Sequence, residues 1–343
     1  MPETLTVVIA SPLEDEHLDR IRAVDPRIEV LHDASLLPTP NYIADHKGSH
    51  PVLDAAQQER WRGMLARADV LFDFDWFEPS LLRTNAPRAT WVQATSSGLG
   101  QVIARNGFDP QGLLLTTAAG VHSIPLAEFA VTGILYFVKE LPLLQQIRAE
   151  RRWEQYTARQ LAGMNVMVVG LGSVGRRTVA SLSALGVAVT AVGRDGREYD
   201  VPTASRRGSI STMTDLLPSV DAVVLCCPLT DETRGLFGAE QFAALPEGAI
   251  LVNIARGGVV DEPAMLDALT TGRLGGAALD VFATEPLPSE SPFWQLENVI
   301  VSPHSASTVS SENHLITDIF VENLRRRLDG RDLVNVYDVA RGY

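Results

Sequence analysis

Short apolar runs rich in β-branched residues alternate along most of the chain with segments in which apolar residues recur every three or four positions. This alternation is typical of α/β proteins built on parallel sheets. In the first third of the chain, strands are predicted over 5–10, 27–31, 69–74, 90–94 and 113–117. Six more are predicted over 165–170, 187–192, 221–227, 249–254, 276–281 and 299–303.

Helical periodicity is clearest over 119–142, which has Pro142 near its end, over 176–186, and over 312–328. The segment 36–52 is polar and rich in proline, and the pattern favours an irregular surface loop without a catalytic role. At 343 residues the chain is longer than a single hydrophobic core usually supports. We therefore expect two domains.

The composition and charge narrow the class of protein. With 45% hydrophobic and 21% charged residues, the chain is an ordinary globular protein. Its formal net charge of −13 argues against nucleic-acid binding, which needs clustered cations. An anionic substrate would therefore be held by a few placed cations and not by a general field.

Cysteine usage and hydropathy indicate a cytoplasmic protein. Cys226 and Cys227 are adjacent in an apolar run, which favours packing residues in a reducing compartment over a disulfide or a nucleophile. The N-terminal residues lack a signal-peptide pattern, and the apolar stretch 126–138 is too short to span a membrane and contains Glu128. No spacing of His, Cys and Asp predicts a metal site.

The stretch GLGSVG over 170–175 fits the pattern G-x-G-x-x-G, enters from a predicted strand and leads into a predicted helix. In this setting Gly170 permits the tight turn, Gly172 lets a pyrophosphate approach the backbone, and Gly175 allows close packing of helix on strand. The N–H groups at the helix N-terminus would bind the phosphates. A ligand-free turn is the weaker alternative.

Several charged residues follow predicted strands of the second half: Arg194, Arg256, Asp280, Glu285 and His304. In open α/β sheets ligands bind beyond the carboxyl ends of the strands, so this clustering predicts a site. Each residue alone has an ordinary structural interpretation.

Three of these residues form a coherent catalytic set. Arg256 precedes a helix with Asp261 as its expected N-cap, and its guanidinium suits a substrate carboxylate and carbonyl. His304 can pass a proton to or from a hydroxyl or carbonyl oxygen, and Glu285 can fix the orientation of the imidazole. Together they fit hydride transfer coupled to proton transfer at a 2-hydroxy or 2-oxo acid.

The chain resembles the D-isomer-specific 2-hydroxyacid dehydrogenases, in particular the glyoxylate and hydroxypyruvate reductases. The motifs that carry the resemblance are GLGSVGRR, CPLTDETRGLF, LVNIARGGVVDE, ALDVFATEPLP and VSPHSAS, in this order. The resemblance is strong over about 119–307 and general in the first hundred residues. It implies two Rossmann-like domains with a cleft between them: a discontinuous substrate domain of 1–118 plus 308–343, and a dinucleotide-binding domain of 119–307.

The resemblance also implies roles for individual residues. His304 would be the general acid in reduction with Glu285 as its partner, and Arg256 would bind the substrate. Backbone N–H groups of Ser97, Gly98 and Leu99 would bind the carboxylate, and Asp280 would lie near the nicotinamide amide. The implied cofactor contacts are Gly170, Gly172, Ser173, Val174, Gly175, Arg194, Cys227, Pro228, Thr233, Ile254, Ala255, Asp280 and Ala306.

Cofactor preference is predicted from AVGRDGR at 191–197. An acid about 20 residues beyond the glycine loop normally accepts hydrogen bonds from the adenosine ribose of NAD. Gly193 stands in that place and Arg194 follows, with Arg197 nearby, which favours NADP(H). NAD(H) remains the alternative, with Asp195 shifted inward.

The predicted reaction is reduction of a small 2-oxo acid, such as glyoxylate or hydroxypyruvate, by a homodimeric enzyme. His122 and Trp153 are weaker candidates for substrate or dimer contacts, with helix-start and packing roles as their alternatives. Family members often have Asp in place of Gly100 and Asn in place of Thr117, so the substrate pocket is expected to be atypical. The alternatives are a nucleotide-sensing binding protein, like the corepressors that resemble this family, and phosphoglycerate oxidation.

Overall fold

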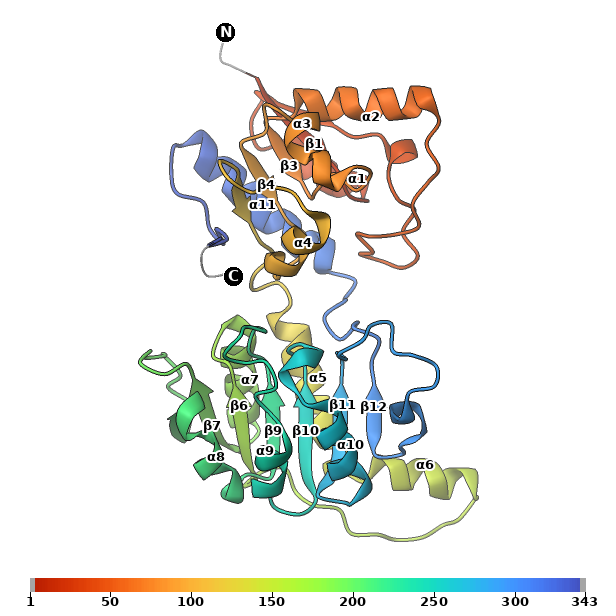
Figure 1. The fold of residues 1–343 in the computed structure, drawn as a ribbon, viewed down its shortest axis with the longest axis vertical. Coiled ribbons are helices and arrows are strands. Elements are labelled where there is room, and N and C mark those ends of the chain that lie inside the picture. Colours follow the sequence, from red (N-terminus) through yellow and green to blue (C-terminus); the bar gives the residue numbers. More distant parts are fainter. Residues whose placement is uncertain (1–3, 340–343) are drawn as a thin grey trace. The chain divides into compact units, whose positions relative to one another are not determined.

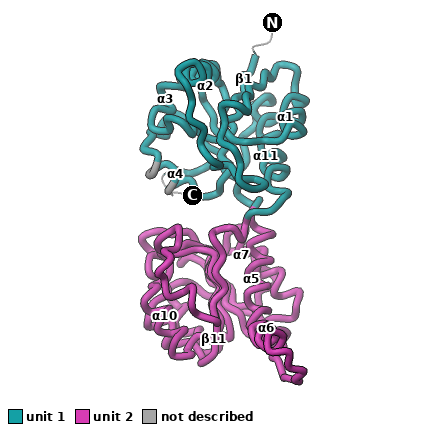
Figure 2. The backbone as a smooth tube through the Cα atoms, turned by 90° about the vertical axis from the view of Figure 1, so that its right-hand side faces the viewer, with its two compact units in different colours: residues 1–121, 308–343 teal, residues 122–307 magenta. Residues whose placement is uncertain are grey.

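The computed structural model describes residues 4–339, which divide into two compact units (Figure 2). Unit 1 contains residues 1–121 and 308–343, and unit 2 contains residues 122–307. Each unit is built on its own parallel sheet.

The sheet of unit 1 has five parallel strands in the order β2-β1-β3-β4-β5 (Figure 1). The strand order reverses between β1 and β3, which is the switch point of a doubly wound sheet. The strands are β1 (Leu5–Ile9), β2 (Ile28–Leu31), β3 (Val70–Phe72), β4 (Trp91–Gln93) and β5 (Leu114–Thr116).

Helices cover this sheet, and the last helix of the chain returns to it (Figure 1). Phe320 of the returning helix packs against the rings of Phe72 and Trp91, at ring-centroid distances of 5.2 and 5.1 Å. Burial of such aromatic side chains joins the two sequence segments of unit 1 into one core. The helices are α1 (Asp15–Arg22), α2 (Ala55–Arg67), α3 (Leu82–Asn85), α4 (Leu99–Asn106) and α11 (Glu312–Leu328), with 3₁₀ turns η1 (Ala34–Leu36) and η2 (Pro79–Leu81).

The sheet of unit 2 has seven parallel strands in the order β12-β11-β10-β9-β6-β7-β8. The order reverses between β6 and β9, as in the Rossmann fold. The strands are β6 (Asn165–Val169), β7 (Ala188–Gly193), β8 (Arg206–Ser209), β9 (Ala222–Leu225), β10 (Ala249–Asn253), β11 (Leu274–Leu279) and β12 (Val299–Val301).

The inner strands of this sheet are apolar almost throughout, and their buried aliphatic side chains form one core cluster on each face. Helix α5 packs closely on it, because a Cβ added at Gly133 would lie 2.6 Å from the Cβ of Ala278. The helices are α5 (Ser123–Val138), α6 (Leu141–Ala149), α7 (Ser173–Ala184), α8 (Met213–Leu216), α9 (Ala239–Ala244) and α10 (Glu262–Thr270). Four 3₁₀ turns complete the unit: η3 (Ile210–Thr212), η4 (Leu217–Ser219), η5 (Gly257–Val259) and η6 (Pro292–Gln295).

The predicted α/β class with two doubly wound parallel sheets is confirmed, and each predicted strand is present with shifted ends. Two details were wrong. The helix predicted over 119–142 ends at Val138, and Pro142 instead lies in the first turn of α6, where its missing N–H costs nothing. Strand β8 was not predicted, because its sequence RRGS has no apolar residue. Among the described residues, no helix is long and apolar enough to cross a membrane.

Candidate active site

The glycine loop follows β6 at the switch point of the second sheet, and two of its glycines are required by close packing. Gly170 has a φ of 101°, and a Cβ there would lie 2.6 Å from the backbone nitrogen of Cys227. A Cβ at Gly175 would overlap the carbonyl oxygen of Gly170 and lie 3.1 Å from Sγ of Cys226. Only glycine fits either position, so the loop is held tightly against the end of β9.

The third glycine of the loop is different, because its surroundings are open. A Cβ at Gly172 would meet nothing within 4 Å, and Gly172 is the N-cap of α7 without a side chain that caps the helix. The N–H groups of the first turn, at Ser173 and Val174, are therefore left to an external acceptor. This cradle fits the phosphates of a dinucleotide.

Arg256 lies directly after β10, on a loop that its neighbours hold in place. The side chain of Asn253 accepts from the N–H of Ala255 at 3.1 Å and donates to the carbonyl oxygen of Arg256 at 3.3 Å. A Cβ at Gly257 would overlap the backbone of Phe282, so the arginine loop packs directly on the chain that follows β11. The backbone around the guanidinium is thus fixed from both sides.

The charge of Arg256 is stabilised by carboxylates of the same region. Burial lowers the pKa of its guanidinium, while the charges of Glu285 and Asp280 raise it. One guanidinium nitrogen, Nη1, donates to the carbonyl oxygen of Ala255 at 2.7 Å. A further anion, such as a substrate carboxylate, would add to the charge compensation that Glu285 and Asp280 provide. The expected N-cap Asp261 is confirmed, because its carboxylate accepts from the N–H of Ala264 at 3.1 Å.

Asp280 organises the loop that carries the histidine. Its Oδ1 accepts from the hydroxyl of Ser302 at 2.6 Å and from the N–H groups of Ser305 and Ala306 at 2.8 and 2.9 Å. The carbonyl oxygen of Asp280 accepts from the N–H of His304 at 3.0 Å. The residue is only 2% exposed, and this burial raises the pKa of its carboxyl, which the three hydrogen bonds oppose.

His304 and Glu285 form a pair on this loop. Nδ1 of His304 lies 2.8 Å from Oε2 of Glu285, and the other carboxylate oxygen accepts from the N–H of Phe282 at 3.0 Å. His304 has a φ of 54°, a backbone conformation that is uncommon for residues other than glycine and is often found at functional sites. The carboxylate holds one ring nitrogen, which leaves Nε2 for a substrate.

The remaining predicted cofactor contacts line the ends of β9 and β10. The Thr233 hydroxyl donates to the carbonyl oxygen of Pro228 at 2.6 Å and accepts from the N–H of Thr230 at 2.8 Å, so the turn after β9 is compact. Ile254 and Ala255 are buried directly after β10. Burial raises the pKa of the Cys227 thiol to about 11, which agrees with its interpretation as a packing residue.

The end of β7 carries the residues that were predicted to choose the cofactor. Nε of Arg194 lies 3.9 Å from Oε2 of Glu232. Asp195 is directed to Ser211, whose hydroxyl and N–H both donate to its carboxylate, the N–H at 3.3 Å. Hydrogen bonds from Ser211 lower the pKa of Asp195, which is fully ionised near neutrality.

The predicted carboxylate-binding residues lie in unit 1, at the carboxyl end of β4. Gly98 is the N-cap of α4, and Leu99 is the first, buried residue of that helix. Ser97 precedes them and is exposed. His122 is the N-cap of α5, and its side chain makes no cap hydrogen bond.

Two further titratable side chains, Asp73 and His46, lie near the carboxyl ends of strands of the first sheet and were not among the residues predicted from the sequence. Asp73, with a φ of 67°, follows β3 and accepts from the Thr95 hydroxyl at 2.9 Å. His46 comes from the proline-rich segment 36–52, and its Nδ1 lies 2.9 Å from the Ser11 hydroxyl. Desolvation raises the pKa of Asp73, which the nearby His46 opposes. Asp73 directly follows strand β3, and this position alone could have marked it as a candidate site residue in the sequence. Across the described residues, no group of three His, Cys, Asp or Glu could hold a metal ion.

Comparisons with known proteins identify the family of the chain. Residues 131–306 match the family model "D-isomer specific 2-hydroxyacid dehydrogenase, NAD binding domain". D-3-phosphoglycerate dehydrogenase of Mycobacterium tuberculosis is 34% identical over 267 residues, which are 75% of this chain and 48% of that protein. The chain thus spans about half the length of these mycobacterial relatives.

Two solved structures are similar over nearly the whole chain. One is a D-isomer specific 2-hydroxyacid dehydrogenase from Xanthobacter autotrophicus in complex with NADPH and MES, with 28% identity and a TM-score of 0.78 over 99% of this chain and 100% of that one. The other is an NADPH-dependent glyoxylate/hydroxypyruvate reductase from Sinorhizobium meliloti in complex with NADP and sulfate, with 26% identity, a TM-score of 0.79 and the same coverage. With a Rossmann sheet, a glycine-rich loop and this family match, the chain belongs to the D-isomer specific 2-hydroxyacid dehydrogenases, NAD(P)-binding oxidoreductases.

Proposed function

We propose that the protein reduces a small 2-oxo acid to the D-2-hydroxy acid with NADP(H) as its preferred cofactor. The observation that carries this proposal is the pair of His304 and Glu285, which lies with Arg256 at the carboxyl ends of the strands that follow the glycine loop. A base, a cation and a phosphate cradle in one unit are the parts that a hydride-transfer enzyme for an anionic carbonyl compound needs.

The glycine loop would hold the dinucleotide, with Gly172, Ser173 and Val174 at the phosphates. When bound, the reduced nicotinamide supplies the hydride for the carbonyl carbon. The compact turn around Pro228 and Thr233, the loop after β10 with Ala255 and the loop after β12 with Ala306 would contact the rest of the cofactor.

Arg256 would bind and polarise the substrate. Its guanidinium is planar and can donate to the carboxylate and to the neighbouring carbonyl oxygen at once. Because the side chain is partly buried, each hydrogen bond to it is stronger than in water. The backbone N–H groups of Ser97, Gly98 and Leu99 in unit 1 are proposed as further donors to a substrate carboxylate.

His304 would supply the proton. With Nδ1 directed at Glu285, the proton on Nε2 is transferred to the carbonyl oxygen as the hydroxyl forms, and the reverse transfer accompanies oxidation. Glu285 compensates the charge of the protonated ring and keeps its orientation.

Cofactor preference rests on the end of β7. Gly193 contributes no carboxylate to repel a 2′-phosphate, Arg194 offers a cation, and Asp195 is engaged by Ser211. The two solved relatives described above contain NADPH or NADP, which supports the same choice.

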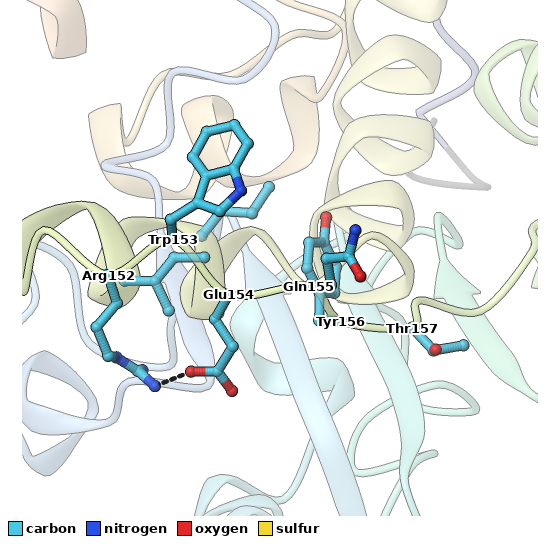
Figure 3. A pocket seen from close by; sticks show the side chains of 8 residues that line it. Arg152, Trp153, Glu154, Gln155, Tyr156 and Thr157 are labelled. Atoms are coloured by element: carbon cyan, nitrogen blue, oxygen red, sulfur yellow. Dashed lines mark hydrogen bonds and ion pairs between the residues drawn. The ribbon is translucent and has the colours of Figure 1, made fainter.

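We further propose that the protein is a homodimer that associates through α6 and the segment that follows it. Trp153 is 100% exposed and Tyr156 is 42% exposed, and with Leu144 and Ile147 they line a hollow of about 640 Å³. Figure 3 shows the Trp153 ring on the opposite side of the chain from the Arg152–Glu154 ion pair. Polar side chains also line the hollow: Arg152, Glu154, Gln155 and Thr157. Exposed aromatic side chains among polar ones are typical of protein–protein interfaces, which supports this surface as the dimer contact.

Steady-state assays with a panel of 2-oxo acids and NADPH or NADH test this function. We expect turnover on the order of 1–10³ s⁻¹ with a short 2-oxo acid such as glyoxylate or hydroxypyruvate. Dinucleotide-dependent binding of a protein partner without turnover would favour the alternative of a nucleotide-sensing protein. Turnover restricted to phosphoglycerate would change the substrate but not the catalytic set.

A further inference from the structure

The space beyond the end of β7 is filled by an aromatic ring. A Cβ added at Gly193 would lie 2.7 Å from Cδ2 of Tyr199 and in closer contact still with Cε2, with Cδ1 of Leu171 at 3.3 Å. Gly193 is buried and does not adopt a left-handed backbone conformation. Glycine is therefore favoured at this position by packing and not by its φ angle, because the Tyr199 ring occupies the space that a Cβ would need.

The ring is itself held by several contacts. Tyr199 is partly buried against the core cluster that contains Ala191 and Val201, on one face of the sheet. Its hydroxyl oxygen accepts from the N–H of Arg194 at 3.4 Å, and Cζ of Arg197 lies 5.2 Å from the ring centroid. A guanidinium over an aromatic face is attracted by the ring quadrupole, so Tyr199 restrains Arg197 as well as the backbone of Arg194.

A carboxylate side chain at position 193 and the Tyr199 ring in its present position therefore overlap. An acid introduced at Gly193 to accept hydrogen bonds from the ribose of NAD would have to displace the ring. The acid that is present, Asp195, is directed to Ser211. Arg194 and Arg197 both contact Tyr199 and are the cations that we assign to a phosphate at this turn.

We propose that Tyr199 determines cofactor specificity in this protein: it excludes an acid from position 193 and orders Arg194 and Arg197 for the 2′-phosphate of NADP. This inference rests on the proposed function, since it assumes that a nicotinamide dinucleotide binds at the glycine loop. It assigns the preference to a packed aromatic residue outside the strand and not to the missing acid alone. Restoring the acid by itself is therefore expected to damage the site and not to convert it.

A double-mutant cycle over Gly193→Asp and Tyr199→Ala tests this coupling, with Tyr199→Phe as the matched control that keeps the ring. Affinities are measured by calorimetry for NADP⁺ and NAD⁺, and for adenosine 2′,5′-bisphosphate against adenosine 5′-monophosphate, which isolates the 2′-phosphate. Thermal unfolding of each variant is followed in parallel. None of these measurements depends on the substrate or on turnover.

We expect Tyr199→Ala to weaken NADP⁺ and the bisphosphate by about tenfold, the equivalent of one charge-assisted hydrogen bond, and to change NAD⁺ by less than about twofold. Gly193→Asp alone should weaken both dinucleotides by about tenfold and lower the melting temperature, as overpacking does. The double variant should regain stability and bind NAD⁺ at least about tenfold more tightly than Gly193→Asp does. Tyr199→Phe keeps the ring beside Gly193 and Arg197 but loses the acceptor for the Arg194 N–H, so its NADP⁺ affinity should lie between those of the wild type and Tyr199→Ala.

Three results would overturn the inference while the proposed function stands: unchanged NADP⁺ affinity in Tyr199→Ala, tighter NAD⁺ binding by Gly193→Asp alone without loss of stability, or strict additivity of the two changes. A wild-type protein that binds neither dinucleotide would overturn the proposed function, and the inference with it.

Discussion

The Nδ1 atom of His304 lies 2.8 Å from Oε2 of Glu285. The backbone N–H of His304 donates to the carbonyl oxygen of Asp280. The carboxylate of Asp280 accepts hydrogen bonds from Ser302 and Ser305, which flank the histidine in the sequence. The imidazole is thus restrained through its ring and through its backbone. In general acid–base catalysis the position of the imidazole is the first requirement, because a proton is transferred only between atoms within hydrogen-bond distance.

Removal of the imidazole should abolish most of the proton transfer. We expect His304→Ala to lower kcat for 2-oxo acid reduction by about 10²–10⁴-fold. Glu285→Gln keeps the shape of the side chain but loses its negative charge. It should therefore also lower kcat, by a smaller factor than His304→Ala does. Stopped-flow or steady-state assays give both values, and calorimetric NADP⁺ affinity serves as a control for folding. Near-normal turnover of His304→Ala would refute the assigned role.

The guanidinium of Arg256 should be needed as a planar group and not as a charge alone. Lysine keeps the charge but cannot donate two parallel hydrogen bonds, so Arg256→Lys should raise KM for the 2-oxo acid by at least about tenfold. Its affinity for NADP⁺ should remain close to that of the wild type. An unchanged KM in this variant would mean that another cation binds the carboxylate.

The loop that carries Arg256 depends on close contact between two backbone segments. A Cβ at Gly257 would overlap the backbone of Phe282, and we expect Gly257→Ala to destabilise unit 2 by about 1–3 kcal/mol or more and to lower activity. Gly63 is the matched control, since it lies exposed inside α2 with no atom within 4 Å of an added Cβ. Gly63→Ala should stabilise the protein by about 0.5–1 kcal/mol. Urea unfolding measures both, and equal effects would contradict this account of the loop.

The aromatic residue beyond α6 should be required for association. If α6 and its following segment form the dimer interface, replacing the exposed Trp153 by Ser should weaken dimerisation by at least about tenfold. Trp294, 51% exposed on η6 and bonded to the carbonyl oxygen of Pro288, provides a matched control variant that should remain dimeric. Light scattering after size-exclusion chromatography measures the mass of each. A monomeric wild type at micromolar concentration would exclude the proposed dimer.

Sequence reasoning worked best where local pattern and chemistry coincide. The strands of the second sheet are continuous apolar runs, and Arg256, Asp280 and His304 follow them directly. Because parallel strands end at one edge, knowing the strands is enough to bring these residues to one region. The glycine loop was likewise readable, since the tight turn and the close helix each require the absence of a Cβ.

What could not be predicted depends on contacts between residues distant in sequence or without an apolar signature. Strand β8 is recognised only by its pairing with β7. His46 meets Ser11 across 35 positions, and nothing in the polar segment around it indicates that contact. The contact of Tyr199 with Gly193 is close in sequence, but it depends on how the chain after β7 folds back on the sheet, which no periodicity encodes.

Stability in unit 1 should decrease as the pH falls, because a histidine is buried between two helices. His17 of α1 is 3% exposed, faces Glu14, Glu16 and Arg20 on its own segment and His314 of α11, and burial lowers its pKa below 6.5. The unfolded chain therefore binds more protons than the folded one as the pH falls through this value, and the contribution of His17, complete above pH 6.5, is progressively lost below it.

We expect His17→Gln to lose less stability than the wild type between about pH 7.5 and 5.5 in urea titrations. The loss will not vanish, because burial also lowers the pKa of His32. A variant at the exposed His50 controls for the removal of one histidine from the chain. If His17→Gln and the wild type lose the same free energy of unfolding, the buried imidazole is not the group that titrates, and the carboxylates that face it become the next candidates.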